Sequence, residues 1–239
     1  DRKIKRDGDN FDLNPFSASQ ENLLGLSTGF RNSFFYNRGK QRHSLTYTYL
    51  NNRAKNLLSV GSQESKNSSH QLQYSHLYMK SWLFDLSGKT LKSEALVENY
   101  TARNYSIHGF QLAPKISYLF SQNASWDIFY EYQYKRNRFI NFETLKQTRL
   151  GTSFTYLSSK KLTMNGEFSL YENKFIGDPL TPVSFQMLEG LQPGQNMTWR
   201  LLVQKNLTDY LDININYQGR KSETSQVIHN GNIQLRAYF

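Results

Sequence analysis

Apolar and polar residues alternate along most of this chain. Trp126, Ile128 and Tyr130 share one parity, whereas Asp127 and Glu131 share the other. Successive side chains of a β-strand point to opposite faces, so this pattern predicts a strand with one apolar and one polar face. The same alternation recurs from about residue 24 to the end of the chain, which predicts an all-β protein.

Turn residues divide the alternating region into about eleven segments, most of about 10–15 residues, where roughly 9–11 are enough to cross a bilayer. We expect short turns near residues 38–40, 80–81, 121–124, 158–161 and 206–209. Longer connections are expected at 51–68 and 96–104, which are polar, and at 177–194. Short turns at one end and long loops at the other are typical of outer-membrane barrels. A soluble β-sandwich, the alternative on composition alone, has no reason to separate its loops in this way.

The fold class predicted from the pattern is all-β. We expect an antiparallel up-and-down transmembrane β-barrel of about twelve strands, with eleven counted and 10–14 compatible with the pattern. Residues 24–239 form the barrel, and residues 1–23 form a polar N-terminal segment or an extracellular loop. Asp, Asn, Gly and Pro are frequent in that first segment, and this composition is typical of loops.

Composition agrees with a barrel and excludes a helical membrane protein. The mean hydropathy is −0.68 and the hydrophobic fraction is 38%. The sequence also contains no apolar run long enough for a spanning helix. The aromatic fraction is 15%, with 16 Tyr and 16 Phe, and aromatic girdles at two membrane interfaces would accommodate these residues.

The net charge of +10 is spread along the chain. No block of five or more cations occurs, which argues against nucleic acid as a partner and favours anionic lipid head groups. The absence of cysteine excludes disulfides and thiolate metal sites.

The number of strands poses a problem of parity. Phe239 ends on the side of the short turns, so eleven strands place the start of the first strand, near Leu24, on the side of the long loops. Single-chain bacterial barrels have even strand numbers. We expect either an overlooked strand before Leu24 or, preferably, an upstream strand in a longer polypeptide.

The last ten residues carry the most specific signal. Alternating apolar side chains end on an aromatic residue, and the motif Leu235-Arg236-Ala237-Tyr238-Phe239 resembles the C-terminal assembly signal of bacterial outer-membrane barrels. The resemblance implies that the barrel assembly machinery recognises Ile233, Leu235, Ala237 and Phe239. With residues 220–225, this ending also resembles that of large outer-membrane proteins of Bacteroidota, which implies a location and an assembly route but no chemistry.

A search for catalytic groups yields no candidate. The five histidines, His43, His70, His76, His108 and His229, show no metal-ligand spacing. Phosphate-binding, dinucleotide-binding and nucleophile-elbow motifs are also missing from the sequence. We therefore expect no enzyme activity, no cofactor and no metal site.

Charged residues of the polar parity are expected to face the barrel lumen and to form ion pairs there. They are Lys115, Asp127, Glu131, Lys135, Arg149, Glu167, Arg200 and Arg236. The loop at 177–194 is apolar and holds three of the five prolines, so we expect it to fold over or into the barrel.

These features favour an outer-membrane protein that anchors or joins an envelope assembly, with short turns periplasmic and long loops extracellular. The expected partners are outer-membrane lipid and lipopolysaccharide, the barrel assembly machinery and other envelope proteins. The alternative function is a narrow or plugged channel for small, anionic solutes, because the chain is basic.

Overall fold

The computed structural model describes residues 25–38, 42–58, 61–139, 142–158 and 162–238. In this part of the chain one sheet contains eleven strands, and each pairs antiparallel with the strands next to it in sequence. The strands are β1 (Gly25–Tyr36), β2 (His43–Leu58), β3 (Gly61–Tyr78), β4 (Trp82–Val97), β5 (Tyr105–Ser121), β6 (Ala124–Asn137), β7 (Thr144–Ser158), β8 (Leu162–Ile176), β9 (Gly194–Thr208), β10 (Leu211–Ser222) and β11 (Ile228–Ala237). A 3-10 turn, η1 (Thr101–Arg103), precedes β5, and a helix, α1 (Pro182–Leu188), precedes β9.

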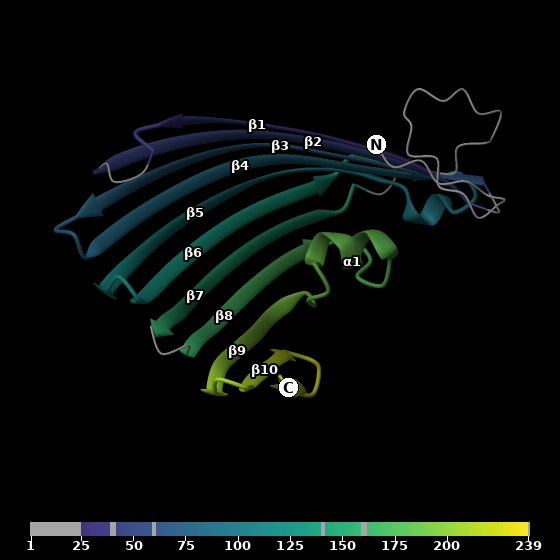
Figure 1. Ribbon diagram of the computed structural model, residues 1–239. Helices are drawn as coiled ribbons and strands as arrows, with labels where there is room; N and C mark the ends of the chain where they lie inside the picture. The colour runs from purple at the N-terminus through teal and green to yellow at the C-terminus, as the bar shows by residue number, and fades with distance from the viewer. Residues whose placement is uncertain (1–24, 39–41, 59–60, 140–141, 159–161, 239) are drawn as a thin grey trace, which may run out of the picture.

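The sheet is curved and open, with one convex and one concave face, and β1 and β11 are its edges (Figure 1). The all-β, antiparallel up-and-down fold is confirmed with the eleven strands counted in the sequence, and the described sheet is open. Because direction alternates from strand to strand, β1 and β11 run the same way. An antiparallel closure between these edges therefore requires an odd number of further strands.

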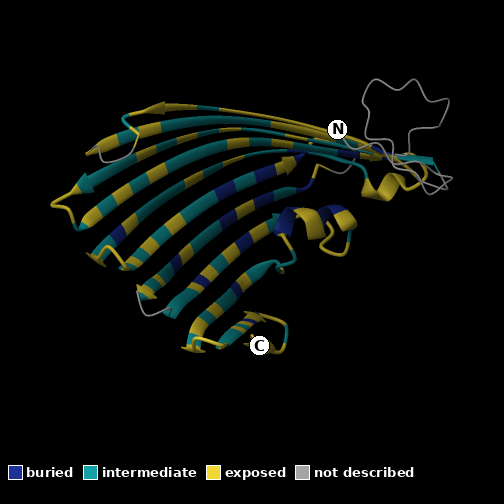
Figure 2. Cartoon of the chain, viewed as in Figure 1, coloured by how far each residue is buried: buried dark blue, intermediate teal, exposed yellow. Residues whose placement is uncertain are grey.

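The two faces of the sheet differ in chemistry. Large apolar side chains are exposed on the convex face, with exposed fractions of 50% for Leu72, 49% for Ile128 and 52% for Leu150. Polar and charged residues of the other parity face the concave side, which also carries most of the buried residues. Figure 2 shows this alternation, with buried positions on β6, β7, β8 and α1.

One expected loop is wrong. The polar stretch 51–68 forms the ends of β2 and β3, which pair from Asn51 with Ser68 to Leu58 with Gly61. Arg53 Nη2 lies 2.7 Å from Glu64 Oε1 across this hairpin. Cross-strand charge pairs of this kind stabilise paired strands that lack apolar alternation, and that alternation is the signal on which the sequence prediction depended.

The expected N-terminal segment, residues 1–23, lies outside the described residues, so its assignment as a separate region stays a prediction. Among the described helices, neither is long and apolar enough to span a membrane.

Candidate functional site

Four neighbouring strands carry charges of alternating sign on the concave face. Arg149 on β7 places Nη2 2.6 Å from Glu167 Oε1 on β8, and its Nη1 lies 3.8 Å from Glu131 Oε2 on β6. Arg200 on β9 reaches the other oxygen of Glu167 at 3.1 Å. The order of charges is therefore acid, base, acid, base from β6 to β9, and each charge has an opposite neighbour.

Arg149 is also held by its surroundings. Its Nε donates to Ser169 Oγ at 3.1 Å, and its guanidinium lies 4.7 Å from the ring centre of Phe129. The ring of Phe129 fits against the bare backbone of Gly151, where a Cβ would come within 2.3 Å of Phe129 Cζ. A glycine on β7 thus lets the aromatic ring lie flat beneath the cation.

The remaining predicted lumen charges are spread over the sheet. Lys115 Nζ lies 3.4 Å from Asp85 Oδ2, a partner that was not among the sequence candidates. Asp127 accepts a hydrogen bond from Ser153 Oγ at 2.9 Å. Arg236 on β11 is in register with Asp212 on β10. The structure therefore gathers Glu131, Arg149, Glu167 and Arg200 into one group and leaves Lys115, Asp127 and Arg236 apart from it.

The segment between β8 and β9 packs onto the concave face through α1 (Figure 1). Val183, Met187 and Leu188 are buried against Ile107 of β5 and Leu145 of β7. This is the hydrophobic cluster of the described structure, and the sheet and the loop segment both contribute to it. The expectation of a packed loop at 177–194 is confirmed.

Local sequence explains the short helix. Thr181 accepts a hydrogen bond from the Ser184 amide at 3.1 Å, and Pro182 follows it at the first helical position. Glu189 and Gly190 have positive φ values, 55° and 78°, so the chain leaves the helix through the left-handed region.

Lys135 connects this segment to the sheet. It is buried, and its Nζ donates to the Met187 carbonyl at 3.0 Å and to Glu189 Oε1 at 2.5 Å. The ammonium therefore satisfies a carbonyl in the last turn of α1, where the helix dipole favours a cation. Lys135 was a sequence candidate, but its partner Glu189 was not.

Buried amides hold the far end of the segment. Asn173 Nδ2 and Asn196 Nδ2 donate to the Gln192 carbonyl at 2.9 and 2.7 Å, and Asn196 Oδ1 accepts from the Gln192 amide at 3.1 Å. Gln147 donates to Asn173 and Ser222 to Asn196, at 2.9 and 2.7 Å. Sequence reasoning missed these amides, although each has the parity of the polar face. A single sequence does not reveal which polar side chains form hydrogen bonds to the main chain of another segment.

The predicted assembly residues lie on the last strand. Ile233 and Leu235 are 67% and 62% exposed on the convex face, and Ala237 ends β11 on the same face. Phe239 lies outside the described residues. Recognition by assembly machinery stays a prediction.

The histidines make several contacts on the convex face, and one of these contacts joins two histidines. His43 and His76 are in register on β2 and β3, with their Nδ1 atoms 2.9 Å apart. Among the described residues, no group of three or more histidine or acidic side chains is placed to hold a metal ion.

Comparison with known proteins identifies the fold. No protein-family model matches the sequence, and no curated protein matches it. CdiB from Acinetobacter baumannii is similar in structure, with a TM-score of 0.53, 13% identity and coverage of 90% of this chain. The chain has the fold of an outer-membrane β-barrel.

Weaker similarities extend over as much of the chain. The translocator domain of autotransporter NalP from Neisseria meningitidis matches 90% of this chain and 82% of that domain, at 11% identity and a TM-score of 0.42. The NanC porin matches 90% of this chain and all of the porin, at 11% identity and a TM-score of 0.45. The chain spans 45% of the length of CdiB, so the similarity to CdiB concerns the sheet and not the activity of a whole protein.

Proposed function

We propose that this protein is an integral β-barrel of the outer membrane that anchors or joins an envelope assembly and has no enzymatic activity. The observation that carries the proposal is the contrast between the two faces of one sheet. Apolar side chains such as Leu72, Ile128 and Leu150 are about half exposed on the convex face, where lipid would cover them. Ion pairs and buried amides occupy the concave face, as in a barrel lumen.

The docked segment favours an anchor over an open pore. Within this segment, α1 and Gln192 lie against the concave face, held by the apolar cluster, by Lys135 and by the amides around Gln192. In a closed barrel this segment would narrow the lumen at the end opposite the short turns. We propose that the short turns are periplasmic, that the opposite end is extracellular, and that the barrel assembly machinery inserts the protein.

A narrow channel for small anions is the second candidate. Arg200 is part of the concave charge group and remains 62% exposed at its side chain. A cation on the wall of a constricted lumen would favour anions. This candidate requires that the docked segment leave a continuous path.

Two measurements test the proposal on the full-length polypeptide. Fractionation of envelopes should place it in the outer membrane, and recovery in the soluble fraction would reject the barrel. In planar bilayers the anchor predicts little or no conductance, and replacing residues 179–192 by a Gly-Ser linker should raise it. A steady anion-selective conductance of the protein with residues 179–192 in place would favour the channel. A large cation-selective conductance would reject both candidates.

A further inference from the structure

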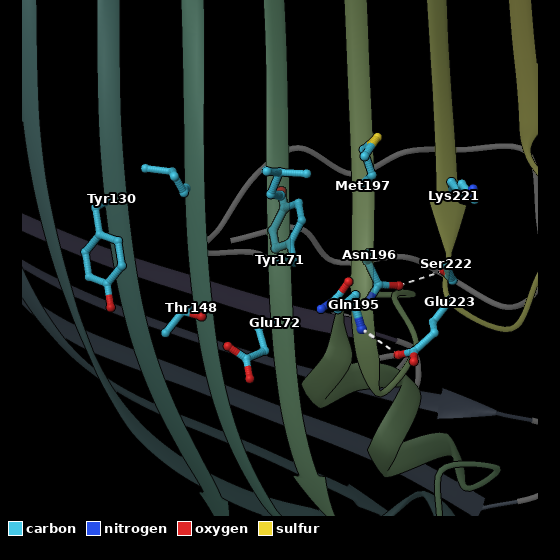
Figure 3. A pocket seen from close by; sticks show the side chains of 12 residues that line it. Tyr130, Thr148, Tyr171, Glu172, Gln195, Asn196, Met197, Lys221, Ser222 and Glu223 are labelled. Carbon is cyan, nitrogen blue, oxygen red and sulfur yellow. Dashed lines mark hydrogen bonds between the residues drawn. The ribbon is translucent and has the colours of Figure 1, made fainter.

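A pocket lies on each face of the sheet beside β9 and β10. The one whose apolar side chains are convex, shown in Figure 3, has two carboxylates, Glu172 and Glu223, against a single cation, Lys221. The concave pocket has a volume of about 490 Å³, within the range of roughly 300–1,000 Å³ that is usual for small-molecule sites. Its polar side chains are Glu167, Thr198, Arg200, Gln218, Arg220 and Asn230.

Strand register places the side chains of the concave pocket next to one another. Arg200 on β9 is opposite Gln218 on β10, which is in turn opposite Asn230 on β11. Arg220, two residues after Gln218, is opposite Thr198. Arg200 and Arg220 are therefore diagonal neighbours on adjacent strands, roughly 7–8 Å apart, with Gln218 beside both of them.

The one carboxylate that lines the concave pocket is already neutralised. Glu167 Oε1 lies 2.6 Å from Arg149 Nη2, and Glu167 Oε2 lies 3.1 Å from Arg200 Nη2. Each oxygen of the carboxylate thus has a guanidinium partner. Arg200 carries further N–H groups that this contact does not use, because a guanidinium has five, and its side chain is 62% exposed.

Arg220 supplies the positive charge that remains in the pocket. Within the described part of the chain no acidic side chain forms an ion pair with it, and its Nη1 donates to the Gly190 carbonyl at 3.4 Å. Glu189, the residue before Gly190, is paired with Lys135. The contact with Gly190 holds the guanidinium beside the segment that carries α1 without neutralising it, so Arg220 is free to bind an anion.

The neutral side chains of the pocket also have unused hydrogen-bonding groups. Thr198, Gln218 and Asn230 have no hydrogen-bond partner among the described residues, and the last two are exposed on the concave face. An amide both donates and accepts, as does a hydroxyl, so this set suits the hydroxyl groups of a ligand. Two guanidinium groups in the same pocket suit a carboxylate.

We propose that the concave pocket binds a small, hydroxyl-rich carboxylate, of the chemical class of the sugar acids. Its carboxylate would lie between Arg200 and Arg220, and its hydroxyls would face Thr198, Gln218 and Asn230. The inference rests on the proposed barrel, whose lumen the concave face would line, and it adds a class of ligand to that lumen. It requires only that solute enters the lumen from one end.

The first test compares three ligands by isothermal titration calorimetry with the full-length protein in detergent. Glucuronate carries both the charge and the hydroxyls, glucose carries the hydroxyls alone, and cyclohexanecarboxylate carries the charge alone. Glucuronate should bind at least about tenfold more tightly than either of the others, because it alone uses both halves of the site.

Arg220→Gln tests the charged half. It removes a cation that has no ion-pair partner to strand, and should weaken the binding of glucuronate about tenfold. Arg236→Gln is the control, with the same change of charge on the concave face of β11 at the end near the short turns, and should keep the affinity of the parent protein. Gln218→Ala with Asn230→Ala tests the hydroxyl half and should weaken glucuronate severalfold. Unboiled samples of every variant should keep the gel mobility of the folded barrel.

Three results would overturn the proposal. The first is a parent protein that binds glucuronate no more tightly than glucose or cyclohexanecarboxylate. The second is an equal loss of affinity in Arg220→Gln and Arg236→Gln, and the third is an unchanged affinity when both amides are replaced. Fractionation separates this question from the location, because a protein outside the outer membrane would refute the proposed function whatever its affinity for glucuronate.

Discussion

Lys135 on β6 donates to the main-chain carbonyl of Met187, 3.0 Å away in the last turn of α1. The two residues are 52 positions apart, and their contact fixes a loop segment to the concave face of the sheet. Because the ammonium is buried and also contacts Glu189, it binds the segment by charge as well as by hydrogen bonding. The mobility of α1 should therefore depend on this one side chain.

Lys135→Met should loosen α1 while leaving the sheet intact. The variant removes the donor to Met187 and leaves a buried carbonyl without that partner, which costs about 1–3 kcal/mol. Hydrogen exchange should show faster exchange of amides in residues 183–190 and little change in β9. Lys205→Met, an exposed position on the convex face of β9, is the matched control. Unchanged exchange in α1 would mean that the apolar contacts of Met187 and Leu188 hold the helix alone.

Arg149 and Glu167 should be energetically coupled. A double-mutant cycle with Arg149→Met and Glu167→Gln should give a coupling of about 1–3 kcal/mol in the free energy of unfolding, because both side chains are largely screened from solvent. Lys174→Met with Glu172→Gln provides a control pair, with side chains 72% and 54% exposed. An exposed pair of this kind should give about 0–0.5 kcal/mol. Equal coupling energies would show that burial on the concave face does not strengthen the ion pair between Arg149 and Glu167.

Gly151 should tolerate no side chain. A Cβ there would lie 2.3 Å from Phe129 Cζ, so Gly151→Ala forces the ring away from Arg149 and should destabilise the protein by about 1–3 kcal/mol. Gly166→Ala is the control, since a Cβ at that position meets nothing within 4 Å. Denaturant unfolding in detergent measures both variants. A harmless Gly151→Ala would show that Phe129 moves freely and that its contact with Arg149 is not required.

The strand pattern was predictable because a membrane barrel imposes a chemical difference at every second residue. Ile213 and Ile215 on β10 alternate with Asp212 and Asn214, and this local signal needs no knowledge of partners. The pattern failed at residues 51–68, where β2 and β3 are polar on both faces. There the pairing of the two strands, and not burial, decides the structure.

The site was less predictable than the fold. Parity placed Lys135 and Arg149 on the polar face of their strands, but the partners of these residues depend on register and on a distant loop. Thr181-Pro182 and Gly190 carry ordinary helix start and stop signals, although the helix between them is short enough to be taken for a loop. The hydrogen bonds from Asn173 and Asn196 to the Gln192 carbonyl depend on tertiary contact alone, so no local sequence pattern predicts them.

A charge introduced on the last strand should impair assembly much more on the convex face than on the concave face. Leu235 is 62% exposed on the convex face, and Leu235→Asp would place a charge where lipid and the assembly machinery are expected. We expect the level of folded protein in outer-membrane fractions to fall severalfold, and Phe239→Ala should act in the same direction. Gln234→Asp introduces the same charge one residue away on the concave face, and should be tolerated because polar neighbours and water can solvate it there. If Leu235→Asp and Gln234→Asp reached equal levels, β11 would present no lipid-facing side, and its assignment as a membrane-spanning strand with an assembly signal would fail.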